Sequence, residues 1–224
     1  MNEIRNRILG GQLNQTSDIL SWRCKKTKNI NWDAFPEDLA SLGIPTLECV
    51  TTALTDDDVI GTGNSMIVYR SSVLIDGVKK EVALKRHKEL FVRKRRKEVL
   101  NEIWHEAKLM SRINHPNVVR IVGVTYKMDQ PILVVELANE DLESYLDGNT
   151  VEWEEKRILC LQVLRGVMAL HKAGAVLGDL KGENVLVFIG ADGSITAKIS
   201  DFGYSSTLSS SGRTYHSSCS NKGM

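Results

Sequence analysis

Two short acidic motifs hold the side chains best suited to chemistry in this chain. Asp179 opens the run Asp-Leu-Lys-Gly-Glu-Asn, which ends at Asn184, and Asp201 follows 22 residues after Asp179 in Asp-Phe-Gly. One carboxylate can accept a proton from a hydroxyl, while an amide oxygen and a second carboxylate can hold magnesium beside phosphate oxygens. Lys181 lies between them, where its ammonium would meet a transferred phosphoryl group. This order and spacing favour phosphoryl transfer, which depends on positioning and charge neutralisation.

A glycine pair earlier in the chain is a candidate for contacting the phosphates. Gly61, Thr62, Gly63 and Asn64 precede Val68 between apolar residues. Glycines let backbone N–H groups approach a phosphate without obstruction by Cβ. The same pair would also suit an ordinary hairpin turn, so this motif depends on the rest of the pattern.

A lysine in an apolar run is the candidate cation for the nucleotide. Lys85 ends the run Val-Ala-Leu-Lys, where its ammonium would be costly to bury without an anionic partner. Glu106 lies in the amphipathic segment 89–113 and is its predicted partner, while Glu102, one helical turn away, is the competing candidate. The alternative for Lys85 is an edge position that faces solvent.

The pattern of apolar residues predicts the elements that position these groups. Short β-rich runs predict strands of one antiparallel sheet at 66–69, 80–85, 118–126 and 132–137, interrupted by the helix over 89–113. Helices are then predicted at 141–146 and 153–173, the second with a buried apolar stripe and with Gly174 at its end. A hairpin is predicted over 185–200, between the two acidic motifs.

Together with His115-Pro116-Asn117, these motifs resemble the eukaryotic protein kinase family over residues 59 to about 205. The resemblance implies an α+β, protein kinase-like fold, in which an antiparallel small lobe with one helix is followed by an incomplete helical large lobe. The implied parts are an N-terminal extension of unassigned role (1–55), the small lobe (56–138), a partial large lobe (139–205) and a mobile tail (206–224).

The resemblance also implies a role for each candidate residue. Asp179 would be the base and Lys181 would meet the transferred phosphate, while Lys85, paired with Glu106, would hold the α- and β-phosphates of ATP. Mg²⁺ would be bound by Asn184 and Asp201. The remaining implied nucleotide contacts, with Val135 as gatekeeper and 136–138 as hinge, are Gly61, Thr62, Gly63, Asn64, Val68, Ala83, Val135, Glu136 and Ala138. A lysine two residues after the base is the serine/threonine form, so the implied partners are ATP and a protein substrate.

Three departures from the family pattern qualify these expectations. Met66 occupies the third glycine position. Leu177-Gly178 replaces the usual His-Arg before the base. The missing histidine removes a support for the Asp201 loop, and the missing arginine removes a cation for a phosphorylated activation loop. No Ala-Pro-Glu and no glutamate follow Gly203. We therefore expect a truncated large lobe, exposure of one face of the helix at 153–173, and weak or absent activity. The alternative function is a non-catalytic, pseudokinase-like module that binds nucleotide or a protein.

Composition limits the partners and the compartment. The 29 Lys and Arg residues nearly balance 28 Asp and Glu residues, so charge gives no reason to expect a nucleic-acid or membrane partner. The basic cluster 93–97 is interpreted as a solvated helix start, because no aromatic residues are interleaved with it. The sequence has no leader-like apolar segment, and its four cysteines lie far apart, which predicts an intracellular, cytoplasmic protein with reduced thiols.

Overall fold

The computed structural model describes residues 39–49, 54–89, 92, 95–127, 130–202, 206–208 and 214–216. Predictions that concern residues 1–38, the basic residues Arg93 and Lys94, Gly203, and most of the tail fall outside this part of the chain. None of the described helices has the length and apolar character that crossing a bilayer requires.

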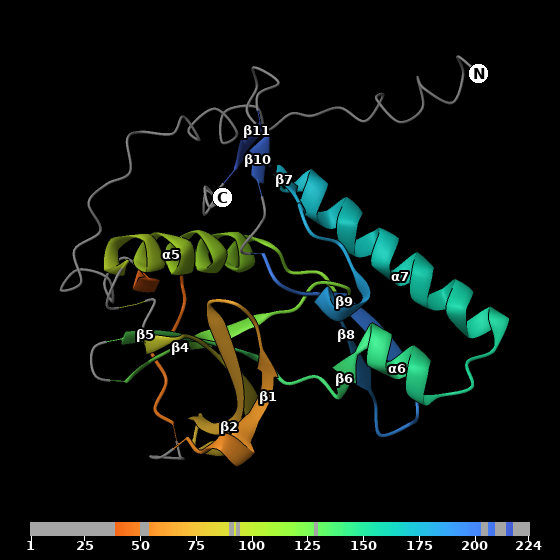
Figure 1. Cartoon of the computed structure of the whole chain (residues 1–224), viewed down its shortest axis with the longest axis horizontal. Coiled ribbons are helices and arrows are strands. Elements are labelled where there is room, and N and C mark those ends of the chain that lie inside the picture. The colour runs from red at the N-terminus through yellow and green to blue at the C-terminus, as the bar shows by residue number, and fades with distance from the viewer. Residues whose placement is uncertain are drawn as a thin grey trace.

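Five antiparallel strands form the larger sheet, and their spatial order is β1-β2-β3-β5-β4 (Figure 1). A short 3-10 helix, η2 (Asp56–Asp58), precedes the strands, which are β1 (Val59–Thr62), β2 (Met66–Ile75), β3 (Val78–His87), β4 (Ile121–Lys127) and β5 (Gln130–Glu136). β2 and β3 extend beyond the predicted runs because Asp76 and Gly77, at φ 52° and 75°, form a two-residue turn between them.

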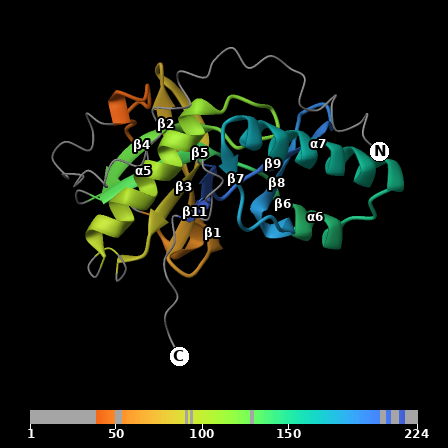
Figure 2. The same cartoon turned by 90° about the horizontal axis from the view of Figure 1, so that it is seen from above.

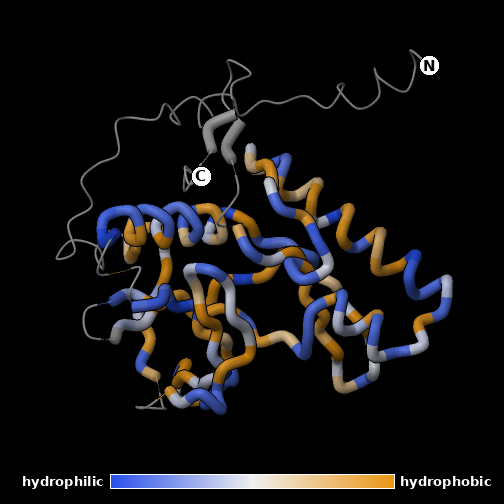
Figure 3. The backbone as a smooth tube through the Cα atoms, viewed as in Figure 1, coloured by the Kyte–Doolittle hydropathy of each residue, from blue (hydrophilic) through white to orange (hydrophobic). Residues whose placement is uncertain are grey.

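One helix covers a face of this sheet, as the sequence predicted. α5 (Arg96–Arg112) turns its apolar side toward the strands and its hydrophilic side outward (Figure 3). Glu89 and Val92, at the start of the predicted segment, are helical, and the non-helical Arg95 precedes the long helix that begins at Arg96. Arg95, Arg96 and Lys97 are exposed. The described part of the basic cluster is therefore a solvated helix start.

Residues 140–199 build a second, smaller sheet with two helices. β6 (Glu140–Asp141), β8 (Val185–Ile189) and β9 (Ile195–Ile199) pair antiparallel in the order β6-β8-β9, which confirms the predicted hairpin. The helices are α6 (Leu142–Gly148) and α7 (Trp153–Lys172), and α7 gives way to Gly174 at φ 76°, as predicted. The chain is therefore α+β, with the predicted antiparallel sheet and helix followed by a helical part.

The segment after the second acidic motif forms strands that the sequence pattern did not predict. β10 (Ser206–Leu208) pairs antiparallel with β7 (Ala175–Val176) and with β11 (Thr214–His216). β7 directly precedes the Asp179 loop, in which η3 (Gly182–Asn184) forms one 3-10 turn. A third small sheet therefore links the backbone just before the Asp179 loop to the backbone that follows the second acidic motif.

The turn between α5 and β4 joins the two parts of the fold. Val119 N–H donates to the carbonyl of Ile199 at 2.9 Å, and Ile199 N–H donates to the carbonyl of Asn117 at 3.0 Å. The buried Asn117 side chain donates to the carbonyl of Ala197 at 2.9 Å. These bonds explain why β4 begins at Ile121 rather than at Val118, since residues 117–119 are paired with β9 instead.

The apolar stripe of α7 is exposed, so the prediction that it would be buried was wrong. Ile158, Leu161, Leu164 and Met168 are 42%, 38%, 56% and 68% exposed. α7 instead packs through Leu159, Gly166 and Leu170, and it lies against β9. The expectation that one face of this helix would be exposed is confirmed.

Gly166 marks the closest approach of α7 to the turn at Asn117. A Cβ at position 166 would lie 2.4 Å from the Asn117 carbonyl oxygen and 2.9 Å from Cδ1 of Ile199. We expect Gly166→Ala to destabilise the fold by about 1–3 kcal/mol through overpacking, despite the better helix propensity of alanine. Urea unfolding measures this loss.

The matched control is Gly148→Ala, because a Cβ at position 148 of α6 would have no atom within 4 Å. We expect that variant to be as stable as the wild type or slightly more stable. Equal stability of both alanine variants would contradict the close packing of α7 against the Asn117 turn.

Candidate functional site

Lys85 and Glu106 form a buried ion pair between β3 and α5. Lys85 Nζ lies 2.5 Å from Glu106 Oε1, and the two side chains are 10% and 6% exposed. Lys85 Nζ also lies 3.6 Å from Asp201 Oδ1. The structure therefore places Glu106, rather than Glu102, beside Lys85, and it excludes the solvent-facing alternative for Lys85.

The charge of Lys85 is maintained by these carboxylates. Burial alone would lower the pKa of Lys85, but the negative charges of Glu106 and Asp201 outweigh burial and hold that pKa above its ordinary value. The ammonium is consequently charged throughout the neutral range. A buried cation flanked by two carboxylates from different elements is suited to hold phosphate oxygens beside a metal ion.

The competing carboxylate, Glu102, approaches a buried histidine instead. Glu102 Oε2 lies 3.9 Å from Nε2 of His87, whose side chain is 4% exposed. Burial, and then the charge of Lys85, lower the pKa of His87 to about 4. His87 is therefore neutral at neutral pH, and its contact with Glu102 is not an ion pair under those conditions.

The Asp179 loop is closed by the side chain of Asn184. Asn184 Nδ2 donates to the main-chain carbonyl of Asp179 at 2.8 Å and to Asp179 Oδ2 at 3.0 Å. These bonds direct the amide nitrogen toward Asp179, so the amide oxygen is the atom suited to ligate a cation. Ser200 N–H donates to the carbonyl of Asn184 at 2.9 Å, which brings Asn184 beside the residue before Asp201.

Lys181 lies at the exposed side of the same loop. Its Nζ is 2.5 Å from Glu183 Oε2 and 3.7 Å from Asp179 Oδ2. The hydrogen bond to Glu183 and the nearby carboxylates hold the pKa of Lys181 above its ordinary value. Lys181 is therefore a charged group beside Asp179.

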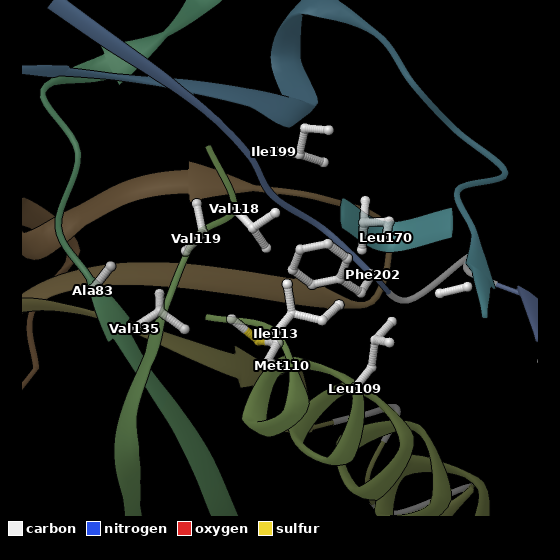
Figure 4. Packing of buried hydrophobic residues seen from close by; sticks show 11 residues of the cluster. Ala83, Leu109, Met110, Ile113, Val118, Val119, Val135, Leu170, Ile199 and Phe202 are labelled. Carbon is white, nitrogen blue, oxygen red and sulfur yellow. The ribbon is translucent and has the colours of Figure 1, made fainter. Parts of the chain in front are cut away.

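Asp201 has an unusual backbone conformation that its neighbour Phe202 stabilises. Asp201 has a φ of 56°, in the left-handed region that non-glycine residues rarely adopt. Phe202 is 2% exposed and packs with Met110, Ile113 and Leu170, residues of α5, its C-terminal turn and α7 (Figure 4). Burial of Phe202 thus fixes the direction in which the Asp201 backbone leaves β9.

Leu177, which stands where the family pattern has a histidine, packs against this same cluster. We expected the missing histidine to remove a support for the Asp201 loop. The apolar contact of Leu177 supplies a support of another kind, because it lies against the packing that buries Phe202.

Three of the predicted nucleotide contacts meet in one apolar region. Val68, Ala83 and Val135 belong to or pack against the cluster that contains Phe202, and Ala83 pairs with Val135 across β3 and β5. Gly61 and Thr62 lie in β1, whereas Gly63 and Asn64 lie in the turn before β2.

Neither Gly61 nor Gly63 is required to be glycine by the packing of the chain itself. The nearest atoms to a Cβ at Gly61 and at Gly63 would be 3.7 Å and 4.0 Å away, at ordinary contact distances. A requirement for glycine at these positions would therefore come from a bound molecule that approaches the backbone.

The predicted hinge contains an ion pair that the sequence pattern did not reveal. Glu136 accepts hydrogen bonds from Arg120 N–H at 2.8 Å and from Lys198 Nζ at 2.7 Å. Lys198, on β9, also lies 4.2 Å from the ring centroid of Phe188. Glu136 and Ala138 are half-buried, and this carboxylate links the hinge to β9. Residues 136 and 198 are too far apart in sequence for a local signal.

A magnesium ion would suit the donors at this site. In the described part of the chain, no group of three or more His, Cys, Asp or Glu side chains could hold a metal ion. The predicted pair is one amide oxygen, from Asn184, and one carboxylate, from Asp201. Mg²⁺ commonly takes one or two carboxylates from protein and completes its shell with substrate phosphates and water, so the pair fits this ion.

Comparison with known proteins shows which family and which relatives the sequence of this chain is similar to. Residues 54–223 match the family described as "Protein kinase domain". The chain is 32% identical over 167 residues to the G-type lectin S-receptor-like serine/threonine-protein kinase SRK of Arabidopsis thaliana, a match that covers 70% of this chain and 18% of that protein. It is 32% identical over 165 residues to the serine/threonine-protein kinase PLK4 of Nematostella vectensis, with 72% and 16% covered. This chain thus spans less than a fifth of the length of these two relatives.

The buried neutral imidazole of His87 makes stability depend on pH. In the unfolded chain this group has a pKa of 6.5, against about 4 in the folded chain, so only the unfolded chain binds the proton between these values. The free energy of unfolding is therefore unaffected by this group above pH 6.5 and decreases as the pH falls toward 4. The total decrease is roughly 3 kcal/mol, since one unit of pKa difference is about 1.4 kcal/mol.

The variant His87→Leu isolates this contribution, because Nδ1 of His87 has no hydrogen-bond partner among the described residues. Urea unfolding at a series of pH values should show that wild-type stability falls more steeply than that of His87→Leu below pH 6.5. Parallel profiles for the two proteins would contradict a neutral buried histidine.

Proposed function

Because this chain belongs to the protein kinase family, we propose that it transfers the γ-phosphoryl group of ATP to a serine or threonine hydroxyl of a protein, with Mg²⁺ as the cofactor ion. The observation that carries the proposal is the position of Lys85, whose Nζ lies 2.5 Å from Glu106 and 3.6 Å from Asp201. One buried cation thereby links the phosphate-binding position to the proposed metal ligand.

Each remaining group has a task that its position supports. Asp179 takes the proton of the acceptor hydroxyl. Asn184 orients the Asp179 carboxylate through its hydrogen bond to Oδ2. Lys181 contributes positive charge where the phosphoryl group passes to the acceptor. Asn184 and Asp201 would hold Mg²⁺, which when bound supplies charge neutralisation at the phosphate oxygens.

The small lobe binds the nucleotide in this proposal. The adenine of ATP packs against the side chains of Val68, Ala83 and Val135 and meets the backbone of the hinge from Glu136 to Ala138. The phosphates lie under Gly61–Asn64, where the absence of Cβ atoms at the glycines lets the backbone approach. ATP is an intracellular metabolite, so we propose an intracellular site of action.

A second candidate is a non-catalytic module that binds nucleotide or a protein. Gly178 beside Asp179 and Met66 at the third glycine position favour it, since both depart from the family pattern. This candidate needs Lys85 and Glu106 for a nucleotide but makes no demand on Asp179.

Transfer of labelled phosphate separates the two candidates. The full chain is incubated with Mg²⁺ and γ-labelled ATP, with casein as the acceptor protein. Because the chain departs from the family pattern, we expect slow labelling of serine or threonine, and we expect Asp179→Asn to reduce its rate by about a hundredfold or more. Asp192→Asn is the matched control, because Asp192 is an exposed carboxylate in the β8–β9 turn that accepts a hydrogen bond from the N–H of Ser194.

The outcomes differ for each claim. Transfer that persists in Asp179→Asn would remove Asp179 as the base. Binding of Mg-ATP by the wild type without transfer to casein or to the chain itself would favour the non-catalytic module.

A further inference from the structure

Residues 39–49 form an ordered segment outside the region matched to the kinase family, which begins at residue 54. The segment begins with a helical end at Leu39 and Ala40, where Gly43 has a φ of 73°. Gly43 N–H donates to the carbonyl of Ala40 at 2.9 Å, and Ile44 N–H donates to that of Leu39 at 3.3 Å. These paired bonds, with Leu39 and Ile44 in one cluster, are a Schellman motif, which reverses the chain sharply.

After this reversal, the segment pairs with the edge of the five-stranded sheet. Leu47 N–H donates to the carbonyl of Val124 on β4 at 2.7 Å, and Val124 N–H donates to the carbonyl of Pro45 at 2.9 Å. The next residues reach β2, where Cys49 forms an antiparallel bridge with Val73. In Figures 1 and 2 this orange segment lies beside α5 and passes the edge of the sheet.

The segment contacts both faces of the sheet. Leu39 and Ile44, 1% and 3% exposed, pack with the apolar side of α5 and with Leu133. Leu47 packs on the opposite face, in a cluster that includes Ile132 and Val134, the neighbours of Leu133 along β5. We call residues 39–49 the strap, because they hold α5, the edge of β4 and the far face of the sheet together.

β4 is shaped to receive the strap at Gly123. A Cβ at this position would lie 2.6 Å from Leu47 Cδ1 and 2.7 Å from the carbonyl oxygen of Pro45. The missing side chain of Gly123 therefore leaves the space that Leu47 and the Pro45 carbonyl of the strap occupy.

The α5 residues beneath the strap are direct neighbours of Glu106. Ile103 and Ala107, which are 2% and 0% exposed, lie in the cluster with Leu39 and Ile44. Ala107 follows Glu106 in the chain, so the rotation of α5 that buries Ala107 also sets the direction of Glu106. Loss of the strap contacts would free α5 to rotate or to move away from the sheet.

We propose that the strap is a positioning element of the site, in which Leu39 and Ile44 hold α5 where Glu106 contacts Lys85. Leu39 and Ile44 are positioning residues, since they act through α5 and contact no reacting group. The inference rests on the proposed function only for its kinetic consequence, because the Lys85–Glu106 contact can be measured without ATP.

The reactivity of Lys85 toward acetic anhydride tests the inference. Peptide mass spectrometry follows acetylation of Lys85 in the full chain at neutral pH, with the exposed Lys79 and Lys80 of the same strand as internal references. Lys85 is 10% exposed beside Glu106, so the reagent reaches its amine only when α5 moves away from the sheet. We expect Leu39→Ala and Gly123→Ala to increase Lys85 acetylation several-fold relative to the references.

Leu159→Ala is the matched control. Leu159 is 2% exposed and belongs to a cluster with Tyr145, Val185 and Val187, which includes no residue of α5 or of the strap. We expect this variant to lower Tm about as much as Leu39→Ala while Lys85 keeps its wild-type rate. Leu39→Met, which conserves volume, should restore the wild-type rate.

An unchanged Lys85 rate in Leu39→Ala and Gly123→Ala, or an equal increase in Leu159→Ala, would overturn the inference. If Leu39→Ala does not fold, Ile44→Val replaces it, because it removes only one methyl group from the same contact. If the wild type transfers no phosphate but the strap variants expose Lys85, the proposed function fails while the positioning role of the strap stands.

Discussion

The ammonium of Lys85 lies in the interior of the fold, and a lone charge there would be strongly unfavourable. Its partners come from two separate elements, Glu106 from α5 and Asp201 from the chain after β9. Removing one partner from a buried ion pair typically costs about 3–5 kcal/mol, because the other charge is left uncompensated. The helix and the acidic loop must therefore both be held in place for Lys85 to be tolerated, and the rest of the structure can be understood through this requirement.

Apolar packing and backbone bonds meet that requirement from several directions. Phe202 is buried between α5 and α7 and fixes the strained backbone of Asp201, while residues 117–119 bond to β9 just before it. Glu136 joins the hinge to Lys198 on β9. The same few contacts hold the strands, α5 and the acidic loop, so they fix the relative positions of the groups proposed for phosphoryl transfer, a reaction that depends on positioning.

Local patterns in the sequence were sufficient where one segment determines its own structure. The amphipathic helix, the hairpin between the acidic motifs and the end of α7 at Gly174 follow from periodicity and turn chemistry. The choice between Glu102 and Glu106 did not, because both lie one turn apart on α5 and only its rotation against the sheet separates them. The stripe of α7 was misjudged since an apolar pattern does not specify which partner buries it. Glu136–Lys198 and the strap depend on contacts between distant segments, although Gly43-Ile44 carried a local signal for the turn.

Thermal unfolding of the full chain with and without Mg-ATP, with Lys85→Met as the comparison, tests whether Lys85 organises a nucleotide site. Ligand that binds only the folded chain at about one hundred times its dissociation constant adds roughly 2.7 kcal/mol, which corresponds to a Tm increase of several degrees. We predict this increase for the wild type, its loss in Lys85→Met, and a smaller effect when EDTA removes the metal. An equal increase in both proteins, or no increase in the wild type, would contradict a nucleotide site organised around Lys85.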